Sequence, residues 1–521
     1  MVQQGNVMTD VGFVNEEEFR GLIEKRAQTL LVLTECLSKC PAPREALTRP
    51  LLGDLLSHSM QLEEILDTYD ASKSCNWCSL RSVTATLKLF SDVSYELLHI
   101  RHRVPKYHLL PVERDFVAAT NEALEFAGLI LARAAREMQN QAPELGLSCA
   151  HQQSVGDRFE ESLPKGRLAH DCEARQVDTV AETVALLATA FLNLASECED
   201  VRATSRAQAQ ERALGSSPAL TEERLRSLEF QFHNLQSQYD TYVSGTKVEH
   251  QDTDLPVLRG HVSVVFHLLR AATLFAHYFE RHVNKQCCTT MSFAGHMVEP
   301  DALSLVLINY SITFIDLYTS RAVSLCQEML KRYAEAGQIE VPIPKYRGFH
   351  VRPSTLIAKL VLHYGSKVQM LLGDEVYDAG SSLDLFRANE KINAQKRRWL
   401  AKEIVRLELV PDHCDAADWT ALVRSVVLAL AEKSKLILYE QPLELPERTC
   451  AGEGTPLERV TDETGRLLAM GKIDIGIDMT ATFIGDKRVL GDIRLLAEHG
   501  YGEDNFGNNV PLPKKLAYLR R

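Results

Sequence analysis

The chain has 521 residues, of which 45% are hydrophobic and 25% are charged, an ordinary globular composition with enough length for about three domains. Its 70 acidic residues outnumber the 58 basic ones and give a formal net charge of −12, which argues against a nucleic-acid-binding or anionic-membrane-binding protein. Met1–Asn15 lacks the basic segment and apolar run of a secretory signal, and polar residues interrupt the most apolar stretches, Thr183–Ala195 and Leu303–Leu317. We therefore expect a cytoplasmic protein without membrane insertion.

The N-terminal part of the chain predicts a helical bundle over residues 1–141. Asn15 and Glu18 have the spacing of an N-cap and its capping-box partner, and apolar residues then recur at helical intervals. Pro41 and Pro43 interrupt this first helix, and three further amphipathic segments follow. Four such helices with short connections favour an antiparallel bundle.

Two pairs of cysteines in this region have the spacing of metal ligands: Cys36 with Cys40 on a predicted helix, and Cys75 with Cys78. Four thiolates could close a tetrahedral zinc site, and a redox dithiol is a further alternative. However, the chain has 12 scattered cysteines, and in a reducing compartment such residues are more often free thiols that pack like small apolar side chains. We expect no metal and no cofactor, with the zinc site as the weaker alternative.

The middle of the chain predicts a long connection and then a second bundle. Residues 142–175 are rich in Gly, Ser, Gln and charged residues without sustained periodicity, which is typical of a linker or long loop. Helical periodicity resumes and predicts a second helical bundle over residues 176–338. A set of four aromatic residues has the spacing of a buried helix face, which indicates core packing rather than a ligand site: Phe266, Phe275, Tyr278 and Phe279.

A predicted strand-to-helix junction at His350 carries the clearest chemical signal. Ile343–Phe349 has the pattern of an extended segment, whereas Ser354–Tyr364 has apolar residues at helical spacing. Pro353 suits the first helical position because its missing N–H would be unpaired there. His350 would then lie at the open end of a helix, where free backbone N–H groups can hold a phosphoryl group. Imidazole is a competent nucleophile near neutral pH, and Arg352 can add charge-assisted hydrogen bonds to phosphate.

The run Gly348-Phe349-His350-Val351-Arg352-Pro353-Ser354 resembles the active-site signature of HPr, the histidine-phosphorylated carrier of the bacterial phosphotransferase system, whose pattern is Gly-apolar-His-x-Arg-Pro-(Ala/Ser). The resemblance implies an HPr-like α+β open-faced sandwich at about residues 339–440, with one helical layer on a small antiparallel sheet. It implies that His350 accepts a phosphoryl group from an Enzyme I-like donor and passes it to another protein. By the same resemblance, Leu383 and Phe386 belong to a docking face.

Ser381 falls where many HPr proteins carry a regulatory phosphoserine, although a serine at a helix start is more often an N-cap. Before it, Lys367–Leu372 and Glu375–Ala379 are predicted strands joined by a Gly373-Asp374 turn. Farther on, we predict the last strand of the domain at Ile404–Val410 and its last helix at Ala416–Lys433.

One segment within the HPr-like region departs from the resemblance, and a C-terminal extension follows that region. Asn389–Lys402 is longer than the corresponding HPr segment and lacks its glycine-containing turn. Residues 441–521 predict a small C-terminal α/β extension, with a half-buried strand over Ile473–Phe483, where apolar residues occupy every second position, and a short helix at Leu490–His499. The remainder, Gly500–Arg521, has the pattern of a loop.

The sequence thus predicts a mainly α, multidomain protein that contains an HPr-like module. The leading hypothesis is a phosphocarrier or phosphorelay regulator, not an enzyme that turns over a metabolite, whose helical domains are a regulatory or partner-binding region. Its partners would be an Enzyme I-like donor and an unidentified protein acceptor, with no nucleic acid. A second hypothesis is a non-catalytic scaffold that uses the module for recognition without phosphotransfer. A third, an enzyme housed in the helical region, has no supporting constellation of residues.

Overall fold

The computed structural model describes residues 13–40, 43–148, 159, 179–207, 220–283, 297–411, 419–439, 442–443, 445, 455–476, 478–504 and 507–520. It is 73% helix and 7% strand, which confirms the predicted mainly α class. The chain divides into two compact units, Met1–Cys326 and Gln327–Arg521. Beyond residue 148, most of the linker predicted at 142–175 lies outside the described residues, as does Ile477 of the predicted C-terminal strand.

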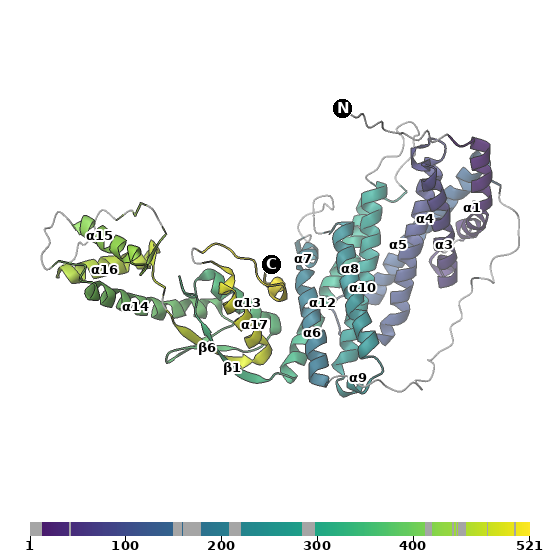
Figure 1. Cartoon of the computed structure of the whole chain (residues 1–521). Helices are drawn as coiled ribbons and strands as arrows, with labels where there is room; N and C mark the ends of the chain where they lie inside the picture. Colours follow the sequence, from purple (N-terminus) through teal and green to yellow (C-terminus); the bar gives the residue numbers. More distant parts are fainter. Residues whose placement is uncertain are drawn as a thin grey trace, which may run out of the picture. The chain divides into compact units, whose positions relative to one another are not determined.

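The first unit is built from helices that run side by side (Figure 1). They are α1 (Glu16–Ser38), α2 (Pro43–Ala46), α3 (Arg49–Thr68), α4 (Cys78–Arg103), α5 (Phe116–Glu144), α6 (Val180–Glu197), α7 (Glu199–Ala207), α8 (Glu222–Tyr242), α9 (Lys247–Gln251), α10 (Asp254–Tyr278), α11 (Pro300–Val306) and α12 (Thr313–Arg332), whose residues from Gln327 onward belong to the second unit. Asn15 is the N-cap of α1, as predicted, and its side chain accepts a hydrogen bond from the N–H of Glu17.

The two predicted helical bundles share one interior. Helices α1, α3, α4 and α5 pack together as expected, but α10 of the second group also packs on α4. Phe90 on α4 contacts the rings of Phe275 and Tyr278 on α10, at centroid distances of 6.4 and 5.1 Å. The hydroxyl groups of Thr86 and Tyr278 are 3.1 Å apart. The prediction of two separate bundles is therefore wrong, because their apolar faces cover each other within a single unit.

By length and composition alone, three described helices could cross a membrane: Val180–Glu197, Asp254–Val283 and Pro300–Arg332. The polar residues within the apolar stretches therefore do not by themselves exclude a membrane span for these helices. In their most apolar windows 39, 78 and 56% of the residues are buried, so Asp254–Val283 in particular uses its apolar surface for packing inside the protein. The absence of membrane insertion stays a prediction.

The second unit contains a four-stranded antiparallel sheet in the order β1-β6-β2-β3. The strands are β1 (Ala336–Pro342), β2 (Gln369–Leu372), β3 (Glu375–Asp378) and β6 (Thr480–Asp486), and the helices beside them are α13 (Val351–Tyr364), α14 (Ser382–Arg406) and α17 (Lys487–Glu498). The predicted β2–β3 hairpin is confirmed, with Leu372 opposite Glu375 across the turn. Phe483 on β6 is opposite Ile339 and Met370 and is fully buried.

Helices lie against the sheet in a single group: α17 packs on β1 and β6, α14 contacts β3, and α13 packs against both helices. Side chains alternate between the two sheet faces. Phe483 and Met370 mark the buried face, whereas Val376 on the opposite face is 59% exposed. The sheet therefore has one well-covered face, and the start of α13 lies in the layer that covers it.

The boundary predicted at residues 440 and 441 does not separate two domains. Strand β6 comes from the predicted extension, yet it pairs between β1 and β2 and forms the centre of the sheet. The strand predicted at Ile404–Val410 is wrong, because Ile404 belongs to α14 and the chain then turns. The 25-residue helix α14 continues to Arg406, the third residue of the predicted strand, and its longer 3.6-residue pattern outweighs the short alternation there.

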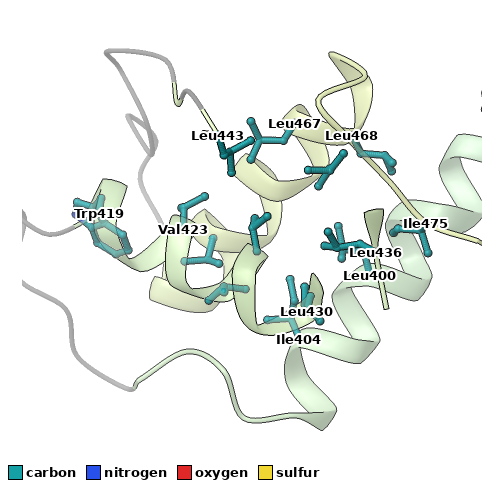
Figure 2. Close-up of a cluster of buried hydrophobic side chains, with 14 residues drawn as sticks. Leu400, Ile404, Trp419, Val423, Leu430, Leu436, Leu443, Leu467, Leu468 and Ile475 are labelled. Atoms are coloured by element: carbon teal, nitrogen blue, oxygen red, sulfur yellow. The ribbon is translucent and has the colours of Figure 1, made fainter. Parts of the chain in front are cut away.

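Residues 407–479, which we call the inserted lobe, lie in sequence between α14 and β6. They contain α15 (Trp419–Glu432), β4 (Ile437–Leu438), α16 (Pro456–Ala469) and β5 (Ile473–Asp474), and β4 pairs antiparallel with β5. Figure 2 shows the lobe's own apolar core, in which Leu400 and Ile404 of α14 meet Val423 and Leu430 of α15 and Leu467 of α16. The C-terminal half of α14 thus serves as one wall of the lobe.

Candidate functional site

His350 is the N-cap of α13, and its carbonyl accepts the first intrahelical hydrogen bond from the N–H of Ser354, at 3.1 Å. The N–H groups of Val351 and Arg352 lie in the first turn, where no helical carbonyl can accept them. Pro353 is the third residue of the helix, not the first as predicted, but its missing N–H falls in the same turn. The predicted junction therefore has an open helix end beside the imidazole.

The segment before His350 is a loop, so the strand predicted at Ile343–Phe349 is wrong; β1 ends at Pro342. The loop contains two successive left-handed residues, Arg347 (φ 57°) and Gly348 (φ 58°). The side-chain amide of Asn389 on α14 donates to the Arg347 carbonyl at 3.1 Å. A Cβ on Gly348 would lie 2.4 Å from Asn389 Oδ1, so both the backbone conformation and the contact require glycine.

We expect Gly348→Ala to destabilise the second unit by about 1–3 kcal/mol, because alanine in the left-handed region is strained and its methyl group would displace Asn389. The measurement is urea unfolding followed by the fluorescence of Trp399 and Trp419 in a Trp77→Phe background, since these two tryptophans lie in the second unit.

The matched control is Gly491→Ala in α17. A Cβ there meets nothing within 4 Å, and alanine in a helix is about 1 kcal/mol more favourable than glycine. Equal urea midpoints for the two alanine variants would contradict the proposed strain at Gly348.

Glu503, which the sequence analysis did not identify, completes the site. Its Oε2 lies 2.7 Å from His350 Nε2, and its Oε1 lies 3.9 Å from Arg352 Nε. Arg352 Nε also donates to the Gly502 carbonyl, at 3.2 Å. The side chains of His350, Arg352 and Glu503 are 21, 33 and 12% exposed, so the imidazole is only partly exposed and the carboxylate is nearly covered.

The C-terminal segment holds Glu503 in place. Tyr501 is buried beside Phe349, at a ring centroid distance of 6.0 Å, and its hydroxyl donates to the Pro342 carbonyl at 2.6 Å. Farther on, Leu516 is fully buried and Lys515 pairs with Asp492 of α17 at 2.7 Å. The described residues of the segment predicted as a loop at Gly500–Arg521 therefore pack on the unit and bring an acidic group to a histidine 153 residues away.

The contact with Glu503 determines which nitrogen of His350 can react. A carboxylate accepts a hydrogen bond from Nε2–H, and this places the lone pair of the neutral ring on Nδ1. Nδ1 makes no hydrogen bond to any residue that the structure describes. The carboxylate would also stabilise positive charge that develops on the ring when Nδ1 attacks an electrophile. The arrangement is thus suited to nucleophilic chemistry at Nδ1.

The other predicted residues have simpler surroundings. Ser381 is the N-cap of α14, and its hydroxyl accepts from the N–H of Asp384 at 3.2 Å, as expected for an N-cap serine. Leu383 and Phe386 on the same helix are 67 and 48% exposed. Val351, the residue after His350, is 70% exposed. Apolar side chains that are free to make contacts are therefore present on both α13 and α14.

The alternative zinc site has no support from the geometry. Cys36 and Cys75 are exposed, whereas Cys78 is buried. Among the described residues, which include Cys36, Cys40, Cys75 and Cys78, no group of three or more His, Cys, Asp and Glu side chains could hold a metal ion.

Glu503 had no signal in the sequence that could have identified it. It follows a predicted helix in a glycine-rich stretch, and no motif spacing connects it to His350. Only the pairing of β6 with β1 and the close packing of α17 on these strands bring it to the start of α13.

Comparison of the chain with protein-family models, with curated proteins and with solved structures finds no match.

Proposed function

We propose that the protein is a phosphocarrier or phosphorelay regulator in which His350 accepts a phosphoryl group from an Enzyme I-like donor. The observation that carries the proposal is the arrangement of His350 at the open end of α13, with Nε2 bonded to Glu503 and Arg352 beside it. The resemblance to HPr adds support, because it implies one helical layer on a small antiparallel sheet, and α13, α14 and α17 on the sheet of the second unit fit that description.

Phosphoryl transfer would use His350, Glu503, Arg352 and the N–H groups of the first turn of α13. The Nδ1 lone pair of His350 forms a bond to phosphorus, and the bond between phosphorus and the donor's leaving atom breaks; the proton on Nε2 stays in its hydrogen bond to Glu503. The first-turn N–H groups and the Arg352 guanidinium offset the negative charge of the phosphoryl group. In the return reaction a neutral imidazole leaves, so the group can pass to an acceptor.

Docking would use the exposed apolar residues of α13 and α14. Val351 lies next to His350 in sequence, and Leu383 and Phe386 lie on α14, the helix whose Asn389 holds the loop before His350. Apolar residues surrounding a reactive group are typical of a recognition surface that excludes water from the transfer. The helical first unit would then read or transmit the phosphorylation state of the second.

Incubation of the full-length protein with phosphoenolpyruvate and Enzyme I tests this proposal. We expect a phosphoryl group that is lost in acid and retained in alkali, because a phosphorus–nitrogen bond to imidazole breaks when the ring is protonated. A label that survives acid would identify a phosphoester of serine, threonine or tyrosine and would contradict the proposal.

A scaffold that uses the second unit for recognition without phosphotransfer is the alternative function. It is favoured by the limited exposure of the His350 side chain, which is 21%, and by the inserted lobe on α14. Partner capture by the wild-type protein with and without phosphorylation separates the two. Capture that changes only on phosphorylation supports the carrier, whereas capture that is equal in both states supports the scaffold.

Glu503→Gln is expected to lower the maximal rate of His350 phosphorylation by about tenfold to a hundredfold, since partners that orient a reacting imidazole commonly contribute this much. Glutamine can still bond to the ring, but it has no charge to stabilise the developing imidazolium. The same loss of charge removes repulsion toward an incoming phosphoryl group, so KM for the donor should stay equal or fall. An increase in KM with an unchanged maximal rate would contradict this role.

A further inference from the structure

A buried ion pair joins the inserted lobe to α14. The ammonium group of Lys396 on α14 lies 2.6 Å from Oδ1 of Asp474 on β5, and their side chains are only 1 and 5% exposed. Burial lowers the pKa of Lys396, and the neighbouring Asp474 opposes that shift. Because such a pair contributes little net stability compared with apolar residues of similar size, its place in the structure calls for another explanation.

Asp474 also contacts the loop that precedes the phosphoacceptor. Its Oδ2 accepts a hydrogen bond from the backbone N–H of Arg347 at 2.5 Å, while Oδ1 also accepts from the N–H of Ile475 at 2.7 Å. Both carboxylate oxygens are therefore used, and one of them fixes the residue that begins the left-handed turn before His350.

Arg347 contacts three parts of the second unit. Its guanidinium lies over the Tyr439 ring of the inserted lobe, 4.3 Å from the ring centroid, and its carbonyl accepts from Asn389 of α14. A Cβ on Gly507, in the loop that follows Glu503, would lie 2.7 Å from Arg347 Nη1. The lobe, α14 and the C-terminal segment thus converge three residues before His350.

We propose that Asp474 is a positioning residue for His350, through which the inserted lobe sets the reactivity of the phosphoacceptor. The inference rests on the proposed phosphotransfer function. A non-glycine residue with positive φ is unfavourable by about 1–2 kcal/mol, so Arg347 needs a partner that holds it in that conformation. Asp474 supplies the acceptor, and the contact with Lys396 orients that acceptor inside the protein. A shift of the lobe would therefore change the turn that presents His350 to Glu503.

Two double variants separate the acceptor from the ion pair. Lys396→Met with Asp474→Asn removes both charges but keeps a side-chain oxygen for the Arg347 N–H. Lys396→Met with Asp474→Leu removes both charges and the acceptor at a similar side-chain volume. The two proteins differ at position 474 alone, and neither contains an unpaired buried charge. If the leucine lowers the unfolding midpoint of the second unit, Asp474→Val replaces it.

Phosphorylation of the full-length variants by phosphoenolpyruvate and Enzyme I is the first readout. We expect the Asn variant to react nearly as fast as wild type, and the Leu variant to have a maximal rate lower by about tenfold or more, with a similar KM for the donor, because the reacting group is misplaced. Hydrogen exchange at the Arg347 amide should be slow in wild type and the Asn variant, and fast in the Leu variant.

Modification of His350 by diethyl pyrocarbonate, read by peptide mass spectrometry, reports its reactivity without any donor protein, and the exposed His499 is the internal control. A difference between the two variants at His350 but not at His499 supports the positioning role even if no phosphorylation occurs, an outcome in which the carrier function alone fails. Equal rates at His350 and equal exchange at Arg347 in the two variants would overturn the inference.

Discussion

Replacing His350 with alanine is expected to abolish the acid-labile phosphoryl group that phosphoenolpyruvate and Enzyme I place on the wild-type protein. The expectation follows from the geometry of the site, where one imidazole lies beside Arg352 and the free N–H groups of the first turn of α13. Without that imidazole, Glu503 is left with no ring to orient, and water cannot retain a phosphoryl group.

His499→Ala is the matched control, because His499 is an exposed histidine of the same unit and its ring bonds to its own helix, through Nδ1 and the Leu495 carbonyl. This variant should be labelled as fully as wild type. Label that persists in His350→Ala would assign the acceptor to another residue. Loss of label in both variants would point to a general effect on folding.

The second large effect is an acid-induced loss of stability in the first unit. Burial lowers the pKa of His99 and His261 to about 4 and that of His282 to about 3. For His261 the geometry agrees, because Nε2 accepts from the Leu110 N–H and Nδ1 faces the Tyr318 carbonyl, each at 3.1 Å, which requires a neutral ring. These histidines stay neutral in the folded protein where the unfolded chain would protonate them.

The direction of the effect follows from proton linkage. Below the ordinary histidine pKa of about 6.5 the unfolded state binds more protons than the folded state, so the free energy of unfolding falls as the pH falls toward 4. Each histidine contributes at most about 1.4 kcal/mol per pH unit to the slope of the free energy of unfolding against pH. The three histidines together contribute at most about 4 kcal/mol per pH unit. Above pH 6.5 this contribution is complete and no longer changes.

The urea midpoint of the first unit between pH 7.5 and 4 measures this slope. Trp77 reports it in a Trp399→Phe, Trp419→Phe background, since it is the tryptophan of that unit. His261→Gln should reduce the slope by about a third, because one of three protonation sites is removed. A midpoint that does not change from pH 6.5 to 4 would contradict the neutral, buried state of these histidines.

Local patterns in the sequence were sufficient for some parts of the fold. The β2–β3 hairpin and the start of α13 beside His350 depend on short signals, a Gly373-Asp374 turn between strands and a histidine just before a helical apolar pattern. The strand predicted at Ile343–Phe349 does not form because the left-handed Arg347 and Gly348 interrupt a segment whose composition is typical of a strand. Backbone conformation there depends on Asp474 and Asn389, which are distant in sequence.

Long-range arrangement could not be predicted in the same way. The inserted lobe separates α14 from β6, so the last strand of the sheet lies 76 residues beyond its predicted place at Ile404–Val410. Glu503 reaches His350 only because β6 and α17 return the chain to β1. Lys396 lies in Asn389–Lys402, the segment that is longer than its HPr counterpart. Only the buried contact of Lys396 with Asp474 indicates its role.

The most direct test of the central claim is to locate the phosphoryl group after reaction with phosphoenolpyruvate and Enzyme I, by digestion near neutral pH and fragmentation mass spectrometry that preserves phosphohistidine. We predict one phosphorylated residue, His350, at near-complete occupancy. A phosphoryl group on any other residue would contradict the account. So would an unmodified His350 under conditions in which an authentic HPr is fully phosphorylated.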